Sequence, residues 1–523
     1  MGAPVLSDNI STFYRSDETY GGLKNYLISQ EALRMDHSEL EKALTTKGQE
    51  LIRQLLQAHL DLRGPGQAIG EVREADDTLH EQPRPQTREL VTLFGTVTVD
   101  RLGYATQGKD SLHPKDAALN LPSDRYSLGI RQRIALEAAK GSFEEAMAEV
   151  ALATGVQVPK RQAEELTVRA AQDFGAFYQE RRETALWRDP GGKILVLTFD
   201  GKGVVMRKQD LREATRKKAE ETTHRLETRL SSGEKRNAKR MATVGAIYTV
   251  KAYPRAPEDV LHALAGDVGP RPASLERPHP ENKRVLASLE STPAEVIAEI
   301  FDDANLRDPK HGKTWVALVD GNANQIKLIR EEAGRRGVSV RIVADFIHVT
   351  EYVWRAGTAF HDPGTKELEA WVQSRLLEIL NGNGGQVAGG MRRSATLRGL
   401  NPEQRKPVDA CARYILTLRR AVSYKWFLSE GYPIATGVIE GACRHLVKDR
   451  MDVTGARWSL TGAEAILRLR ALRSSGDFDE YWAFHEAQEK SRNHAARYKD
   501  GIIPEVVVPN PSPTGRPRFR VVK

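Results

Sequence analysis

The sequence contains very little cysteine and no long hydrophobic run, and each absence excludes a class of protein. Only two cysteines, Cys411 and Cys443, occur among 523 residues, which excludes a disulfide framework and a cysteine-rich zinc module. No segment reaches the roughly eighteen consecutive apolar residues of a membrane-spanning helix. The N-terminus also lacks a basic start followed by an apolar block. These absences predict a soluble, cytoplasmic protein.

Nucleotide-binding fingerprints are missing as well. Neither a P-loop nor a G-x-G-x-x-G motif follows any expected strand, which disfavours a metabolic α/β enzyme. Charged residues, in contrast, are abundant: the sequence contains 78 Lys and Arg and 70 Asp and Glu, which gives a net charge of +8 and a pI near 9.2. This moderate basic excess is compatible with a polyanionic partner such as nucleic acid. The length allows two to four domains.

The N-terminal part is predicted to be mainly helical, with one short β-hairpin. Apolar residues recur at intervals of three and four within residues 1–87, which is typical of helices. A charged, proline-containing connector, READDTLHEQPRPQTR, then leads to ELVTLFGTVTVDRLGY, which alternates around a central glycine. Such alternation predicts paired strands near the start of a second region, residues 88–190.

Three further helices are expected between residues 128 and 175. Ser142 with Glu145 three residues later forms a capping box, Gly155 ends the middle helix, and Pro159 stands where the last helix begins. A tight turn between two short helices resembles a helix-turn-helix unit.

The last of these helices starts with Lys160 and Arg161, two candidate DNA contacts. In a helix-turn-helix unit the final helix enters the major groove, so its first residues would approach the DNA. Small three-helix clusters are also common packing units that bind nothing, and this alternative stays open.

Two apolar segments stop at an aspartate followed by glycine. ILVLTFDGKGVV carries Asp200, and WVALVDGNANQ carries Asp320. Near-continuous Val, Ile and Leu predict strands buried on both faces, and such a strand holds its terminal carboxylate rigidly. Asp-Gly is also a common turn dipeptide, so a single occurrence favours a turn over a catalytic site.

The remaining sequence predicts an α/β core interrupted by helices. TWVALVDG, NQIKLIREEAGRRG and VSVRIVADFIHV read as strand, helix and strand, which indicates a parallel pair with a helical crossover. A glycine-rich break, NGNGGQVAGG, separates two helices that follow, and the chain is expected to end in a disordered basic tail. The expected regions are the core (191–348), an α-helical insertion (349–436), a returning core helix (437–485) and the tail (486–523).

Glu440, in GVIEGACRHLVKDR, is the candidate third acid of a metal site. Three carboxylates repel one another unless divalent cations hold them together, and hard oxygen ligands select Mg²⁺ or Mn²⁺. Two such ions can activate an attacking water or 3′-hydroxyl and stabilise the leaving oxygen of a phosphodiester. This pattern predicts that Asp200, Asp320 and Glu440 are both catalytic and metal-binding.

Basic residues follow Glu440 at helical spacing. Arg444 and Lys448 lie four and eight residues further on and would share its face in a regular α-helix. Together with Arg450 they are candidate DNA-binding residues, although an ordinary row of ion pairs would show the same pattern. Trp458 is expected to pack in the core.

Asp345 and His348 stand three residues apart in ADFIHV, directly after an expected strand. A histidine after a strand is usually a core or surface residue. With an aspartate at this offset it could form a polar cluster beside the carboxylates.

The segments FDGKGV, LVDGNANQ, ADFIHV and GVIEGACRHLVKDRMDVTGARWSLTGAEAILRLRALRSSG together resemble the insertion-sequence transposases of the ISKra type, relatives of the Mutator-like group. The likeness covers most of residues 88–475. It implies an RNase H-like core with an α-helical insertion, a DDE triad at Asp200, Asp320 and Glu440, and a D-x-x-H motif at Asp345 and His348.

The resemblance also supplies the expected reaction. It implies cleavage at transposon ends by water attack with two Mg²⁺ ions, for which Mn²⁺ would substitute. The freed 3′-hydroxyl would then attack target DNA, and the protein would act as a homo-oligomer at the bacterial nucleoid. Two alternatives stay open: an RNase H-like nuclease that does not transpose, and a catalytically idle DNA-binding protein.

Overall fold

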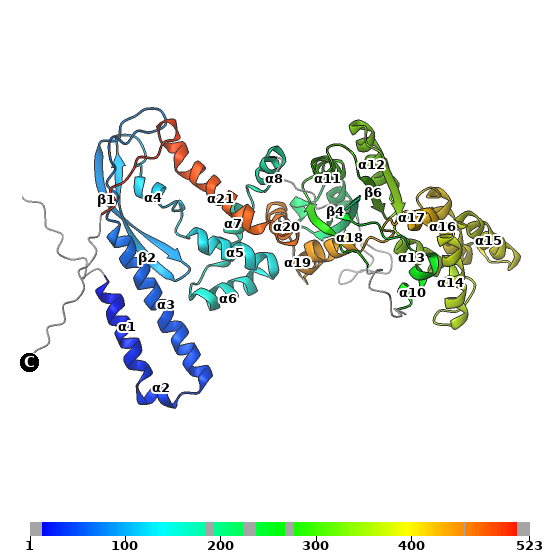
Figure 1. The fold of residues 1–523 in the computed structure, drawn as a ribbon, viewed down its shortest axis with the longest axis horizontal. Helices are drawn as coiled ribbons and strands as arrows, with labels where there is room; N and C mark the ends of the chain where they lie inside the picture. The colour runs from blue at the N-terminus through cyan, green and yellow to red at the C-terminus, as the bar shows by residue number, and fades with distance from the viewer. Residues whose placement is uncertain (1–12, 185–191, 223–236, 267–276, 454, 510–523) are drawn as a thin grey trace, which may run out of the picture. The chain divides into compact units, whose positions relative to one another are not determined.

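The computed structural model describes residues 13–184, 192–222, 237–266, 277–453 and 455–509. The chain forms two compact units, one from Met1–Asp173 with Asp479–Lys523 and one from Phe174–Phe478. The fold is mixed α/β: the first unit contains helices and a β-hairpin, and the second contains a mixed sheet with helices (Figure 1).

The first unit begins with the predicted helices. Short helix α2 (Gln30–Arg34) joins α1 (Tyr14–Leu27) to α3 (His37–Leu62). A capping box between Asp36 and Glu39 starts α3.

The predicted hairpin is confirmed, and its strands are longer than the sequence indicates. Strand β1 (Gln82–Thr92) pairs antiparallel with β2 (Gly95–Ala105) over its whole length. The connector interpretation is therefore wrong for residues 82–88, which are strand residues. Two prolines are tolerated there because this two-stranded sheet leaves β1 a free edge.

The three helices after the hairpin are confirmed as α5 (Leu128–Lys140), α6 (Phe143–Thr154) and α7 (Lys160–Ala170), preceded by α4 (Pro114–Ala118). The Ser142–Glu145 capping box is present, and Gly155 ends α6 at φ 69°. Buried apolar side chains from all three helices form one cluster, which includes Ile134, Val150 and Leu166. The sequence identified both the helices and their caps.

The predicted disordered tail is wrong for residues 487–509. Helix α21 (Phe478–Asn493) places His485 Nδ1 2.7 Å from Asp173 Oδ2 and Glu489 Oε2 3.0 Å from Arg131 Nη1. After two short 3₁₀ turns, η4 (Ala495–Arg497) and η5 (Lys499–Gly501), Val506 forms a β-bridge with Ala68. Residues 510–523 lie outside the described ranges. The order of this segment depends on contacts with residues far away in sequence.

The second unit is built on a five-stranded sheet in the order β5-β4-β3-β6-β7. Strand β3 (Ile194–Val205) is antiparallel to β4 (Lys239–Val250), which is antiparallel to β5 (Glu281–Ser288). On its other side β3 is parallel to β6 (Thr314–Val319), which is parallel to β7 (Val340–Ala344). The predicted parallel pair is confirmed, whereas no strand is predicted from the sequence at the position of β5.

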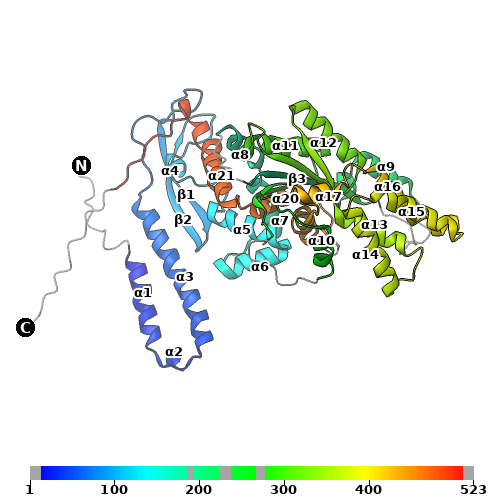
Figure 2. The same ribbon diagram turned by 45° about the vertical axis from the view of Figure 1, so that its right-hand side comes forward.

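Helices pack on both faces of this sheet (Figures 1 and 2). A Cβ on Gly245 of β4 would meet Ile300 and Val296 of α11 (Pro293–Arg307), which places α11 on that face. Helix α12 (Ala323–Arg336), the crossover between β6 and β7, packs beside α11. Phe199 pairs with Gly245, so the next residue, Asp200, points to the opposite face.

The predicted α-helical segment after β7 is confirmed as five helices: α13 (Phe346–Gly357), α14 (Lys366–Leu380), α15 (Gly384–Leu397), α16 (Pro402–Thr417) and α17 (Tyr424–Ser429). The predicted glycine-rich break is wrong, because residues 384–390 begin α15. Gly384 lies against Ile415 of α16, where an added Cβ would come within 3.1 Å of a methyl carbon. Glycine thus permits a close approach of the two helices.

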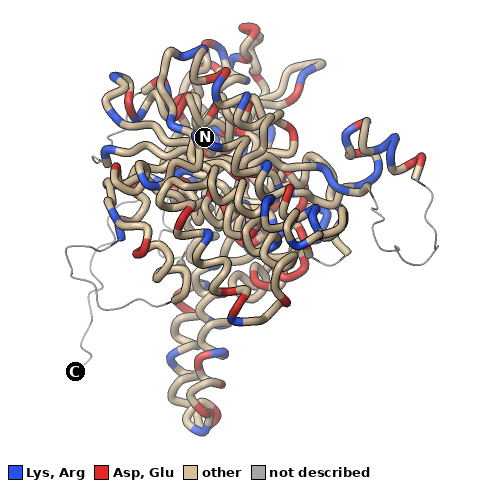
Figure 3. The backbone as a smooth tube through the Cα atoms, turned by 90° about the vertical axis from the view of Figure 1, so that its right-hand side faces the viewer, with Lys and Arg blue, Asp and Glu red and all other residues tan. Residues whose placement is uncertain are grey.

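The last helices of the second unit are α18 (Gly437–Ala442), the π-helical segment η3 (Cys443–Lys448), α19 (Asp449–Met451) and α20 (Leu460–Ser475). Further helices are α8 (Phe174–Glu183), α9 (Glu213–Glu221) and α10 (Pro257–Leu264), with a 3₁₀ turn, η1 (Lys208–Asp210). Basic and acidic residues are intermixed along the chain, including the exposed α9 (Figure 3). None of the helices within the described ranges combines the length and apolar character needed to cross a bilayer.

His113 is expected to make the first unit sensitive to acid. Burial lowers the pKa of His113 to about 4, and the charge of Arg101 adds to this effect. The unfolded chain therefore takes up a proton below about pH 6.5, whereas the folded chain does so only near pH 4, so stability falls as the pH drops through this window. Because His113 is partly exposed, the expected loss is about 1–2 kcal/mol.

Urea unfolding followed by circular dichroism at about pH 7 and about pH 5 measures this loss. His113→Gln should reduce the difference between the two conditions, and His37→Gln, at an exposed histidine, should leave it unchanged. An equal difference in all three proteins would contradict the assignment to His113.

Candidate active site

Three aspartates come into register on three neighbouring parallel strands. Thr198, two residues before Asp200, pairs with Leu318, two residues before Asp320, and Val319 pairs with Ala344 directly before Asp320 and Asp345. Adjacent strands lie about 4.8 Å apart, so these residues follow one another along the edge where the parallel strands end. Ligands of open α/β sheets bind at such carboxyl ends.

Asp200 differs from its predicted position in one respect. It does not end its strand, because β3 continues to Val205 through its pairing with β4, whereas β6 ends at Val319. The half-buried carboxylate accepts a hydrogen bond from its neighbour Gly201 N at 2.6 Å. Its other oxygen accepts one from Cys443 Sγ of η3 at 3.1 Å, which places η3 on the Asp200 face of the sheet.

Asp320 occupies a tight turn, as the turn interpretation of Asp-Gly predicts, and its carboxylate is half-buried. Its Oδ1 accepts a hydrogen bond from Asn322 N at 2.8 Å, and its carbonyl accepts one from the Tyr414 hydroxyl at 2.8 Å. Gly321 has φ +96°, and a Cβ there would lie 2.6 Å from the Tyr414 ring. Glycine is therefore required by backbone geometry and by the close approach of α16.

Asp345 is fully buried and caps α13. Its Oδ1 accepts a hydrogen bond from Ile347 N at 2.9 Å, and its Oδ2 accepts one from the Thr436 hydroxyl. Burial raises the pKa of Asp345, and these two hydrogen bonds oppose that effect. Because both carboxylate oxygens already accept hydrogen bonds, Asp345 is better suited to fix the start of α13 and the segment before α18 than to bind a metal ion.

Glu440 lies on α18, with its side chain exposed. Burial raises the pKa of Glu440, the charges of Asp345, Glu351 and Asp200 raise it further, and His348 lowers it. The carboxylate therefore lies within electrostatic range of Asp200 and of the predicted Asp345–His348 pair. The side chain of His348 is 39% exposed, and its Nδ1 lies 3.9 Å from Glu351 Oε2.

The carboxylates suit a hard divalent cation in chemistry, and they come from neighbouring elements: Asp200 from β3, Asp320 from the end of β6 and Glu440 from α18. Carboxylate oxygens are the ligands that Mg²⁺ and Mn²⁺ prefer. Within the described ranges, no three His, Cys, Asp or Glu side chains are already close enough together to hold one ion. Binding at all three acids would thus require side-chain adjustment.

The basic residues after Glu440 do not follow the predicted regular helix. In η3 the backbone bonds connect residues five apart, so residues four apart no longer lie directly above one another. Arg444 is 72% exposed, with its Nε 3.6 Å from Asp449 Oδ1, and Lys448 is also exposed. Arg450 is buried over the Trp458 ring, 4.7 Å from its centroid, so its proposed DNA contact does not fit its position. Packing of Trp458 is confirmed.

Lys160 and Arg161 stand at the start of α7 in the first unit, on an exposed surface. Lys160 Nζ donates to Glu144 Oε1 at 2.7 Å, and this hydrogen bond raises the pKa of Lys160. Arg161 is 89% exposed and lies 3.3 Å from Glu165. Both ion pairs are on the surface, where such pairs are weak and can give way to a phosphate.

Sequence reasoning missed three side chains that support the acids: Tyr414, Thr436 and Cys443. Cys443 carried one signal, because it is one of only two cysteines and lies three residues after Glu440. No feature of the sequence pointed to Tyr414, which stacks on Tyr352 with ring centroids 4.3 Å apart.

Comparison with known proteins adds one partial similarity. The chain is 31% identical over 122 residues to a UPF0236 protein in the vanSb 3′ region of Streptococcus gallolyticus. The match spans 23% of this chain and 26% of that protein. No protein-family model matches the chain.

Proposed function

We propose that the protein is a DDE transposase of a bacterial insertion sequence, with an RNase H-like catalytic core. The observation that carries the proposal is the alignment of Asp200 and Asp320 on adjacent parallel strands, with Glu440 on a helix facing Asp200. The strand order, with three antiparallel strands continued by a parallel set, supports an RNase H-like core. The helical segment between β7 and α18 fits the insertion expected from the sequence resemblance.

Asp200, Asp320 and Glu440 would hold two Mg²⁺ or Mn²⁺ ions, and such ions activate the attacking oxygen and stabilise the leaving oxygen of a phosphodiester. Cys443 orients Asp200, and Tyr414 holds the turn that carries Asp320. Asp345 and His348 are positioning residues: Asp345 anchors α13, and the charge of His348 favours the ionised form of Glu440.

DNA binding is proposed for two regions, one in each unit. In the first, Lys160 and Arg161 at the start of α7 are available for phosphate contacts. In the second, the exposed Arg444 and Lys448 follow Glu440 and could contact the backbone of the reacting strand. The substrates would be duplex transposon ends and target DNA, joined by a homo-oligomer in the bacterial cytoplasm, at the nucleoid.

Mn²⁺ is expected to stabilise the protein against thermal unfolding, because binding to the folded state alone adds about 2.7 kcal/mol at a concentration one hundred times Kd. Asp200→Asn should remove most of this gain, since it removes a charged ligand. The matched control is Asp362→Asn, at an exposed aspartate in the segment between α13 and α14. An equal Mn²⁺ effect in both variants would argue against a metal site at Asp200.

A further inference from the structure

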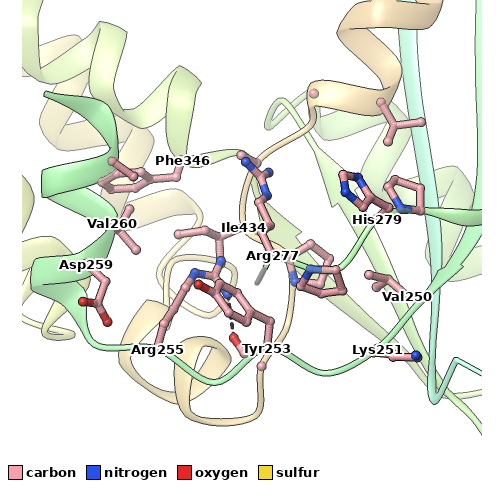
Figure 4. Close-up of a pocket in the computed structure, with 18 of the residues that line it drawn as sticks. Val250, Lys251, Tyr253, Arg255, Asp259, Val260, Arg277, His279, Phe346 and Ile434 are labelled. Atoms are coloured by element: carbon pink, nitrogen blue, oxygen red, sulfur yellow. Dashed lines mark hydrogen bonds between the residues drawn. The ribbon is translucent and has the colours of Figure 1, made fainter. Parts of the chain in front are cut away.

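A cavity of about 490 Å³ opens in the second unit (Figure 4). Its wall consists of the end of β4 with the segment that follows it, residues 277–280, the start of α13 and the segment entering α18. Tyr248 and Val250 of β4 alternate in step with Val244, the partner of Asp200, so they face the same side of the sheet as that acid.

The cavity is on the Asp200 face of the sheet but toward the other end of β3, because Val250 pairs with Ile194 whereas Val244 pairs with Asp200. Phe346 and Ile347, which line it, directly follow Asp345, and Val438, which also lines it, precedes Glu440 by two residues on α18. A group bound in the cavity would therefore contact the two elements that carry Asp345 and Glu440.

One wall is held rigidly by backbone hydrogen bonds. Tyr253 N donates to Gly431 O at 3.0 Å, and Arg255 N donates to Leu428 O at 3.2 Å. The Arg255 guanidinium adds bonds to the carbonyls of Tyr253 at 2.9 Å and Tyr432 at 3.3 Å. Gly431 has φ +75°, and a Cβ there would lie 2.4 Å from Tyr253 N. This wall of the cavity is thus preformed, as the walls of small-molecule sites usually are.

Positive charge exceeds negative charge along the lining. Lys251, Arg255 and Arg277 are opposed by one carboxylate, Asp259. Burial lowers the pKa of Arg255 to about 10, and the charge of Arg277 acts in the same direction. Two arginines that repel each other in a partly buried cavity favour an anionic ligand.

The rest of the lining suits a flat, apolar group. The Tyr253 ring lies beside the Arg255 guanidinium, whose central carbon is 5.3 Å from the ring centroid (Figure 4). Val260 and Val438 add half-buried apolar surface. Aromatic rings and arginine planes are the surfaces on which unpaired bases stack.

We propose that this cavity binds one unpaired nucleotide of a DNA strand, with the base against Tyr253 and the phosphate at Arg277. A cavity of this volume suits one small planar group with its phosphate and not a paired duplex. The proposal rests on the proposed function and adds a binding site for a DNA strand on the face of the sheet that carries Asp200.

The test uses the full-length protein and two labelled duplexes, one with blunt ends and one with a few unpaired nucleotides at one end. One unpaired base is a fluorescent adenine analogue, whose emission falls when it stacks. We expect the unpaired end to bind about tenfold more tightly than the blunt end and its emission to be quenched. Arg277→Gln and Tyr253→Leu should each lose most of this preference while retaining affinity for the blunt duplex.

Two controls separate a specific effect from misfolding or lost charge. Tyr253→Phe should keep the preference, because it keeps the ring, and Arg330→Gln, an exposed arginine of α12, should also keep it. Equal affinity of the wild-type protein for both duplexes would overturn the proposal while leaving the proposed function standing. So would a preference that survives both cavity variants.

If the protein binds neither duplex, the proposed function fails, and adenosine monophosphate becomes the probe. Binding of this nucleotide that Arg277→Gln abolishes would support a nucleotide site filled by a free mononucleotide. Absence of binding would overturn the cavity assignment too.

Discussion

Glu440→Gln is expected to reduce the joining of a pre-cleaved DNA end to target DNA by about a thousandfold or more. Glutamine keeps the shape of the side chain but removes the negative charge that would help to hold the metal ions. Because Glu440 is exposed on α18, its replacement is not expected to unfold the protein, so a folding defect would not explain such a loss. Joining is measured with an end that carries a free 3′-hydroxyl and a supercoiled target plasmid, with Mg²⁺ or Mn²⁺.

The matched control is Glu430→Gln, because Glu430 is an exposed glutamate directly after α17. This variant should join ends at the wild-type rate. Joining by Glu440→Gln at the same rate as the control would remove Glu440 from the catalytic set.

Arg284→Leu is expected to lower the free energy of unfolding by about 3–5 kcal/mol. Arg284 is 1% exposed on β5 and donates to Asp303 and, at 2.6 Å, to Glu299 of α11. Its guanidinium also lies 3.6 Å from the centroid of the Tyr178 ring. Leucine would leave the buried carboxylate of Asp303 without its cationic partner.

Urea unfolding gives the size of the effect. Lys283→Leu, at the exposed neighbouring position on β5, should change stability by less than about 0.5 kcal/mol. The double change Arg284→Leu and Asp303→Leu should recover much of the loss, because it removes the unpaired charge as well. A single variant as stable as the control would show that the buried ion pair contributes little.

Local signals in the sequence predicted much of the fold. The capping box at Ser142 and Glu145 and the glycine at 155 depend only on neighbouring residues, so they located α6 correctly. The strand, helix and strand around Asp320 predicted a parallel pair, and that pair brings the predicted acids to one edge.

Elements that depend on distant contacts were missed. Strand β5 contains Arg284, whose charge interrupts the apolar pattern and is compensated by Asp303 and Glu299 of α11. Helix α15 begins in a glycine-rich segment that packs closely on α16, and residues 487–509 are ordered by residues far earlier in the chain. The spacing of apolar residues within a short stretch of sequence carries no information about such distant contacts.

The same division applies to the candidate site. The acids could be named from the sequence because each follows or faces a recognisable element. The hydrogen bonds of Cys443 with Asp200 and of Tyr414 with Asp320 join residues 243 and 94 positions apart. The π-helical turn after Glu440, which changes the direction of Arg444 and Lys448, has no evident signature in the sequence.

The proposed function requires that Asp200, Asp320 and Glu440 support the cutting of DNA at specific ends. The most direct test is cleavage of a labelled duplex that carries the DNA flanking the gene, with Mg²⁺ or Mn²⁺, by the wild-type protein and by Asp200→Asn. We expect metal-dependent cuts at the element's ends, and we expect Asp200→Asn to abolish them. Cutting by Asp200→Asn at the wild-type rate, or binding of the ends by the wild-type protein without any cleavage, would contradict the proposed function.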